Sequence, residues 1–157
     1  MSVSHAIDHS QLDASADAWD AALAAALRER GQRVTSQRLV IHRALRELDR
    51  HATAEEVLLA VSDRLPGVSL PTVYATLDLF EELGIVRRVS AGGGPALYDP
   101  RADTHHHLVC LVCGRVEDLE GEVDLGPAMR AARRRSFSPR DAELVISGLC
   151  ADCANRD

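Results

Sequence analysis

Hydrophobic positions in the first third of the chain repeat with the spacing of helices. Residues 16–30 are rich in alanine and leucine, and this run stops at Gly31. In residues 34–49, hydrophobic side chains recur three and four positions apart, which predicts a helix with one buried face. That face comprises Val34, Ile41, Ala44, Leu45 and Leu48.

Two further helices carry recognisable start and stop signals. Residues 53–65 open with Thr53 and Glu56, the spacing of a capping box. Residues 69–84 open with Ser69 as a candidate N-cap and have Pro71 in the first turn, where its missing N–H costs little. Gly84 is expected to end this helix. Its predicted core face comprises Leu70, Val73, Leu77 and Phe80.

After Gly84 the pattern changes to short strands. Residues 85–90 and 95–99 flank the glycine-rich stretch 91–94, which predicts a hairpin with a glycine tip. Helices followed by such a hairpin are typical of a winged helix-turn-helix domain, which we place at residues 15–99. We expect residues 1–14 to be disordered and the polar segment 100–104 to act as a hinge.

The remaining residues, 105–157, predict a second and smaller domain. Segments 107–113 and 115–120 look like strands joined by a turn at Cys113 and Gly114, residues 125–136 like a helix, and residues 142–150 like a third strand. The predicted fold class is α+β, a winged-helix domain followed by a small α/β domain. About 50 residues bury little hydrophobic surface, so this domain would benefit from a metal or from dimerisation.

Composition limits the setting in which the chain works. No hydrophobic run approaches the ~20 residues of a membrane span, and the polar, acidic start lacks the features of a signal peptide. We therefore expect a cytoplasmic protein with no membrane association. The formal net charge is -6, yet all 18 basic residues are arginine, whose planar guanidinium suits phosphate and guanine.

Two Cys-x-x-Cys pairs lie at the edges of the second domain. Cys110 and Cys113 form one pair, and Cys150 and Cys153 form the other. Two such pairs can complete a tetrahedral shell of four thiolates, which favours a structural zinc. The alternatives are a redox-active pair or two local disulfides, but neither explains why both pairs flank the same small domain.

A histidine cluster indicates a second metal site. His105 and His107 would point to the same face of a strand, while His106 points away. Nitrogen and carboxylate donors together suit Fe²⁺, Mn²⁺ or Zn²⁺. The alternative is a solvated histidine run of low complexity. The candidate donors are His51, Asp99, His105, His107 and Asp118.

The other histidines carry weaker signals. His42 lies among arginines on a predicted helix, so we interpret it as a surface or phosphate-facing residue. We assign no role to His5, His9 or His106.

Arginines concentrate between Arg28 and Arg50. This segment contains seven arginines and only three acidic residues. Such an excess suits DNA phosphates, although a solvated helix face would look the same. The winged-helix pattern favours DNA, because the helix at 69–84 would then enter the major groove with its N-terminal end leading. The expected DNA-binding residues are Arg33, Arg38, Ser69, Thr72, Tyr74 and Thr76.

Taken together, these stretches resemble the Fur family of bacterial metal-dependent repressors. The resemblance covers about residues 27–153 and rests on RVTSQRLVI, HATAEEV, SLPTVYATLDLFEELGIV, HHHLVCLVCGRVED and CADC. It implies a non-enzymatic homodimer that binds an AT-rich palindromic operator in double-stranded DNA. It also implies a structural zinc on the four cysteines and a regulatory site on His51, Asp99, His105, His107 and Asp118.

The resemblance also bears on the signal that is sensed. Iron-sensing members often have Glu where Asp99 stands, so Asp99 favours the peroxide-sensing PerR branch with Fe²⁺ or Mn²⁺ as regulatory metal. A zinc sensor of the Zur type and an iron or manganese uptake regulator remain alternatives. Ala142 replaces a histidine that some members carry, and Ala75 replaces a polar or basic DNA-contacting residue. A metal-dependent hydrolase is disfavoured because no clear general base is present. A metal-storage or adaptor module also remains open.

Overall fold

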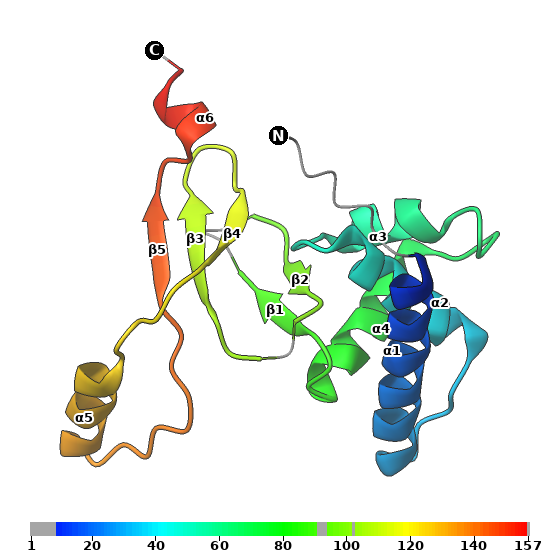
Figure 1. Cartoon of the computed structure of the whole chain (residues 1–157), viewed down its shortest axis with the longest axis horizontal. Helices are drawn as coiled ribbons and strands as arrows, with labels where there is room; N and C mark the ends of the chain where they lie inside the picture. Colours follow the sequence, from blue (N-terminus) through cyan, green and yellow to red (C-terminus); the bar gives the residue numbers. More distant parts are fainter. Residues whose placement is uncertain (1–8, 91–93, 102, 157) are drawn as a thin grey trace. The chain divides into compact units, whose positions relative to one another are not determined.

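The chain folds into two compact units (Figure 1). The computed structural model describes residues 9–90, 94–101 and 103–156. The first unit contains the described residues up to Arg88 together with Leu97–Arg101. The second contains most of the remainder, from residue 103 onwards. The predicted α+β fold, with helices preceding a small mixed domain, is confirmed.

Four helices build the first unit, and their ends are fixed by local hydrogen bonds. They are α1 (His9–Glu29), α2 (Ser36–Leu48), α3 (Ala54–Val61) and α4 (Leu70–Glu82). The Thr53 capping box is confirmed, since Thr53 and Glu56 each accept a hydrogen bond from the other's backbone N–H. The Ser69 cap is confirmed by its hydrogen bond from the Thr72 N–H. Gly84 takes the left-handed φ of 69° that follows the last turn of α4.

The first helix begins earlier than predicted. α1 starts at His9 rather than at residue 16, so the expected disorder is wrong for residues 9–14. This segment contains no glycine or proline to stop a helix. The rest of that expectation concerns residues 1–8, which lie outside the described residues, as do residues 91–93 at the expected glycine tip.

The core of the first unit comes from the predicted helical faces. α2 packs against α1, α3 and α4, and α3 packs against α4. Val34 and Leu70 are only half-buried, because they lie at or before the helix starts. The strands β1 (Arg87–Val89) and β2 (Leu97–Asp99) pair as the predicted hairpin. Side chains with no exposed surface include Leu23, Leu27, Ile41, Leu45, Val57, Val61, Val73, Leu77, Phe80 and Tyr98.

The second unit is a three-stranded sheet with two helices. Its strands are β3 (His106–Cys110), β4 (Val116–Leu119) and β5 (Val145–Gly148), in the order β4-β3-β5. β3 runs antiparallel to β4 and parallel to β5. The helix α5 (Gly126–Arg134) connects β4 to β5, and the short α6 (Ala151–Ala154), which we did not predict, follows β5.

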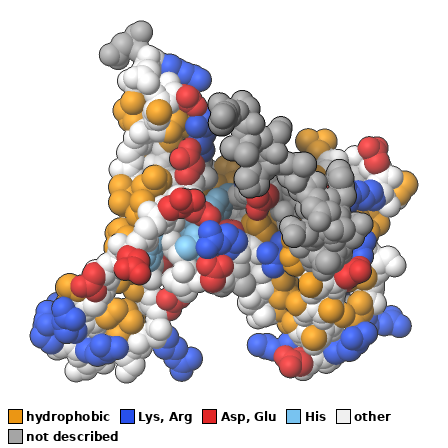
Figure 2. Space-filling model, in the orientation of Figure 1, with side chains coloured by type: hydrophobic (Ala, Val, Ile, Leu, Met, Phe, Trp, Pro, Cys, Tyr) orange, Lys and Arg blue, Asp and Glu red, His pale blue; other side chains and the backbone are white. Residues whose placement is uncertain are grey.

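Hydrophobic side chains remain exposed in the second unit. None of the residues of α5 is buried, and both Val145 and Ile146 of β5 are nearly half exposed. Figure 2 shows hydrophobic side chains on the visible surface of this unit and arginines at α5. Leu111, Val112, Phe137 and Leu149 are each more than half exposed. A unit with so small a core needs further support.

The burial of His42 corrects our interpretation of that residue. Its side chain is 1% exposed and meets Phe80 edge-on, with the ring centroids 5.6 Å apart. Neither ring nitrogen has a hydrogen-bond partner among the described residues. The buried face of α2 is wider than the sequence pattern indicated because α4 also packs on it, so a position adjacent to Ile41 and Leu45 is enclosed.

We predict that His42→Leu stabilises the first unit. At neutral pH the variant should gain about 1–3 kcal/mol, because two unsatisfied nitrogens leave the core. Burial, with a contribution from Arg46, lowers the pKa of His42 from 6.5 to about 4. The unfolded chain therefore binds a proton that the folded chain resists, so wild-type stability should fall from pH 6.5 towards pH 4, by up to about 3 kcal/mol.

Urea unfolding followed through Trp19, the single tryptophan, measures both effects. The His42→Leu curve should lack the part of the acid response that His42 contributes. The matched control is His106→Leu, which replaces a histidine of the second unit. This variant should keep the wild-type loss of stability on acidification. Equal loss of stability on acidification in the wild type and His42→Leu would exclude His42 as the responsible group.

Candidate metal centres and DNA-binding face

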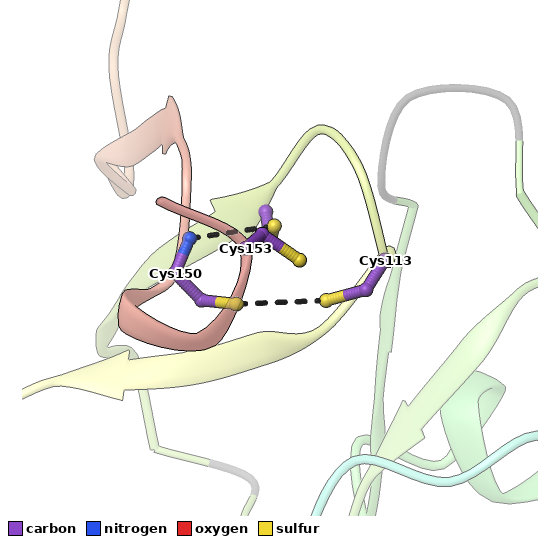
Figure 3. A group of neighbouring side chains, drawn as sticks. Cys113, Cys150 and Cys153 are labelled. Carbon is purple, nitrogen blue, oxygen red and sulfur yellow. Dashed lines mark hydrogen bonds between the residues drawn. The ribbon is translucent and has the colours of Figure 1, made fainter. Parts of the chain in front are cut away.

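Sheet pairing brings the two cysteine pairs together. Cys110 ends β3 and pairs in register with Gly148 of the parallel strand β5. The carboxyl ends of both strands therefore lie side by side at the same end of the sheet. The turn after β3 carries Cys113, and α6 returns Cys153 towards Cys150 (Figure 3). All four cysteines are free thiols.

The cysteine cluster has the dimensions of a tetrahedral metal shell. Its four sulfur atoms lie within 4.8 Å of one another, and Cys113 Sγ lies 3.7 Å from Cys150 Sγ. Sulfurs at Zn–S distances of 2.3 Å on a tetrahedron lie about 3.8 Å apart. A disulfide requires about 2.05 Å, so the observed spacing fits zinc better than local disulfides.

The thiols differ in acidity before any cation is considered. Backbone N–H groups of Cys113, Cys150 and Val112 stabilise the Cys110 thiolate and lower its pKa to about 6. The side-chain hydrogen bond with Cys150 raises the pKa of Cys153 to about 12. A bound cation would favour the thiolate form of all four groups, since metal ligands must be deprotonated.

In the first unit, backbone pairing places His51 opposite Asp99. Ala52 and Tyr98 form an isolated antiparallel bridge, with N···O distances of 3.0 and 2.8 Å. In antiparallel register the residues next to this bridge, His51 and Asp99, also face one another. His51 Nε2 lies 3.2 Å from Asp99 Oδ2, and both side chains are less than 10% exposed.

In the second unit, two imidazoles and a carboxylate converge. His107 of β3 pairs in register with Asp118 of β4. His105 Nε2 lies 3.1 Å from His107 Nε2 and 3.2 Å from Asp118 Oδ1. His105 and His107 are nearly or wholly enclosed, so the two nitrogens meet away from bulk water. Two ring nitrogens that face each other and an anionic oxygen form a donor set that a divalent cation would satisfy.

His106 is directed elsewhere, as the strand period predicted. Its Nδ1 accepts a hydrogen bond from the Leu144 N–H at 3.2 Å. One contact to the cluster was not anticipated from the sequence. Glu143 Oε1 lies 2.7 Å from His107 Nδ1. The parallel pairing of β3 and β5 creates this contact between residues 36 positions apart, and no local pattern could have indicated it.

The expected groove-contacting residues cluster in the first turns of α4. The Ser69 and Thr72 hydroxyls are 2.9 Å apart. The Tyr74 hydroxyl donates to Glu55 at 3.1 Å, which raises the pKa of Tyr74 and keeps it a neutral donor. Thr76 differs from the other three, because it is 7% exposed and its hydroxyl donates to the Thr72 carbonyl. This burial counts against Thr76 as a DNA contact.

Two of the clustered arginines are already paired with carboxylates. Arg43 binds Asp20, and Arg50 binds Glu56 at 2.9 Å. Arg33 lies in the segment before α2 and is exposed, and Arg38 donates to its carbonyl oxygen at 2.5 Å. The formal excess of positive charge between Arg28 and Arg50 therefore overstates the charge available to phosphates.

Among the helices that the structure describes, none has the length and hydropathy needed to cross a bilayer.

The sequence profile of the Ferric uptake regulator family matches residues 29–147. Two curated relatives are the transcriptional regulator FurA of Mycobacterium tuberculosis, 36% identical over 83% of this chain and 89% of its own length, and the peroxide-responsive repressor PerR of Staphylococcus aureus, 32% identical over 84% and 89%.

Solved structures agree with the sequence relatives. The ferric uptake regulator of Pseudomonas aeruginosa with manganese is 34% identical, with a TM-score of 0.66 over 80% of this chain and 95% of that chain. A zinc uptake regulator complexed with zinc and DNA is 26% identical, with a TM-score of 0.64 over 88% and 95%. The chain is therefore a member of the ferric uptake regulator (Fur) family of metal-responsive transcriptional regulators.

Proposed function

We propose that this Fur-family protein is a repressor whose operator binding depends on one regulatory cation. Its ligands are His51 and Asp99 of the first unit and the cluster His105, His107 and Asp118 of the second. The observation that carries this proposal is that each unit holds an incomplete donor set. The first offers one nitrogen and one carboxylate, the second two nitrogens and one carboxylate.

Mixed nitrogen and oxygen ligands suit Fe²⁺ and Mn²⁺, and also Zn²⁺. When bound, the cation supplies a cross-link between the DNA-binding and dimerisation domains. The hinge that we propose between the two domains is residues 100–104. Ligands from both domains would make cation binding and operator binding favour each other, and such coupling is typically worth ~1–3 kcal/mol.

Operator contacts come from the first turns of α4 and from the segment at the start of α2. Ser69, Thr72 and Tyr74 suit the major groove, where a recognition helix enters with its N-terminal end leading. Arg33 and Arg38 suit the flanking phosphates. The structure of a related zinc uptake regulator complexed with DNA supports DNA binding by this chain. We expect an AT-rich palindrome with half-sites about one helical turn, ~34 Å, apart, bound by a dimer in the cytoplasm.

The four cysteines hold a structural zinc, and the exposed hydrophobic side chains of the second unit are covered by a second copy of the chain. The sulfur spacing of 3.7 Å supports the zinc. The exposure of Val145, Ile146 and Phe137 supports the dimer, because a β5 edge and an α5 helix without buried residues leave this unit short of a core.

We predict that His51→Ala abolishes the metal response while leaving the dimer intact. For the wild type, Mn²⁺ should tighten operator binding by about 5–150-fold, the range of typical allosteric coupling. The variant should show almost no tightening, because the DNA-binding domain loses its nitrogen ligand. Fluorescence anisotropy of a labelled operator, titrated with and without Mn²⁺, measures this.

His9→Ala is the matched control for the His51 variant, since it removes a histidine at the first position of α1. It should respond to Mn²⁺ as the wild type does. A full Mn²⁺ response in His51→Ala would contradict the shared regulatory site.

A second prediction concerns Cys113→Ser. The variant should lose its zinc and, with it, the dimer, because a unit with so few buried side chains depends on the metal for its folding. Zinc analysis and analytical ultracentrifugation provide the measurements, with Ser62→Ala at the C-cap of α3 in the first unit as control. A zinc-loaded dimer of Cys113→Ser would show that the cysteine cluster is not a structural zinc site.

Peroxide sensing is the more specific role that we propose. An aspartate at position 99 and the relation to PerR support it. With Fe²⁺ bound, H₂O₂ should add one oxygen atom to the imidazole of His51 or His105, releasing water. Peptide mass spectrometry detects the added oxygen, and the same treatment with Mn²⁺ should leave both peptides unchanged. Unmodified peptides after iron and peroxide would favour an iron, manganese or zinc uptake regulator instead, which metal titrations of operator binding would separate.

A further inference from the structure

Glu143 contacts the one ring nitrogen of His107 that faces away from the histidine–aspartate cluster. The 2.7 Å distance between Glu143 Oε1 and His107 Nδ1 is that of a strong, charge-assisted hydrogen bond. The His107 side chain has no exposed surface, while that of Glu143 is 28% exposed. The His107 end of this hydrogen bond is therefore shielded from water, whereas the Glu143 side chain is partly exposed, so a substitution at position 143 can be accommodated.

The backbone around Glu143 is held firmly against β3. The His107 N–H donates to the Leu144 carbonyl at 2.9 Å, and the Leu144 N–H donates to His106 Nδ1. Just before it, Asp141 accepts a hydrogen bond from the Thr104 hydroxyl at 2.8 Å. These bonds fix the start of β5 beside the start of β3. The carboxylate of Glu143 is therefore held next to His107 Nδ1.

This contact decides which nitrogen of His107 carries the proton. A neutral imidazole holds a proton on only one nitrogen, and a carboxylate can only accept a hydrogen bond. The proton must then lie on Nδ1, which leaves the lone pair on Nε2. That atom lies 3.1 Å from His105 Nε2 and 3.9 Å from Asp118 Oδ1, inside the donor cluster.

We propose that Glu143 is a positioning residue for the regulatory metal. It holds His107 in the Nδ1–H form, aims the Nε2 lone pair into the cluster and makes the ring a stronger donor through its negative charge. Carboxylate–histidine–metal arrangements of this kind typically change metal affinity by about 10–100-fold. The inference rests on the proposed regulatory site, and it adds a residue that is not itself a ligand.

The first test reads the position of the proton without any regulatory metal. Long-range ¹H–¹⁵N correlation spectra of the zinc-loaded wild-type dimer, recorded at mildly alkaline pH, should show His107 with a protonated Nδ1 and a bare Nε2. In Glu143→Leu the Nδ1–H form should lose its dominance, because leucine cannot accept the bond. A bare Nδ1 in the wild type, or an unchanged Nδ1–H form in Glu143→Leu, would overturn the proposal.

The second test measures Mn²⁺ binding by competition with a fluorescent chelator. Glu143→Leu should bind Mn²⁺ about 10–100-fold more weakly than the wild type. Glu117→Leu is the matched control, since this glutamate of β4 lies 3.6 Å from Arg115 in the same sheet, and it should bind as the wild type does. Zinc content and circular dichroism confirm that both variants are folded.

The two tests separate the possible failures. Wild-type affinity in Glu143→Leu would refute the role of Glu143 and leave the regulatory site standing. A wild-type protein that binds no Mn²⁺ beside its zinc, with the Nδ1–H form present as expected, would refute the proposed regulatory site while the bond between Glu143 and His107 stands.

Discussion

Backbone pairing between distant segments sets the positions of several candidate metal ligands. In the first unit, the bridge between Ala52 and Tyr98 places His51 opposite Asp99. In the second unit, the antiparallel register of β3 and β4 places His107 opposite Asp118. Because a shift of one residue would turn each side chain to the other face of its strand, the ligand geometry depends on these registers being held. Tyr98, fully buried and hydrogen-bonded to Asp78, helps to hold the first of them.

The two units are stabilised in different ways. The first buries a continuous set of aliphatic side chains from four helices, and its helix ends are closed by Thr35, Thr53 and Ser69. The second buries few side chains, two of which are His107 and Cys110. Two proposed metal ligands thus occupy places that hydrophobic residues would fill in an ordinary core. This arrangement ties the stability of the second unit to its proposed metals and partner copy more than to its own packing.

The positive charge that the DNA-binding unit offers depends on its ion pairs as well as on its number of arginines. Arg43, Arg50 and Arg64 each engage a carboxylate from another part of the unit, so their positive charge is largely compensated. These bridges join α2 to its neighbours or fix the start of α3, which gives the arginines a structural role. These ion pairs leave less uncompensated positive charge on this unit than the number of its arginines indicates.

The sequence by itself determined the fold class, the helix caps at Thr53 and Ser69, and the residue types of both metal clusters, because capping and ligand chemistry depend on local spacing. Family resemblance added the expected regulatory ligand set, which comprises His51, Asp99, His105, His107 and Asp118. Tertiary structure decided what depends on packing between elements. It enclosed His42, because α4 widens the buried face of α2, and it turned Thr76 inward. It also brought Glu143 to His107, since parallel pairing between β3 and β5 leaves no trace in local sequence patterns.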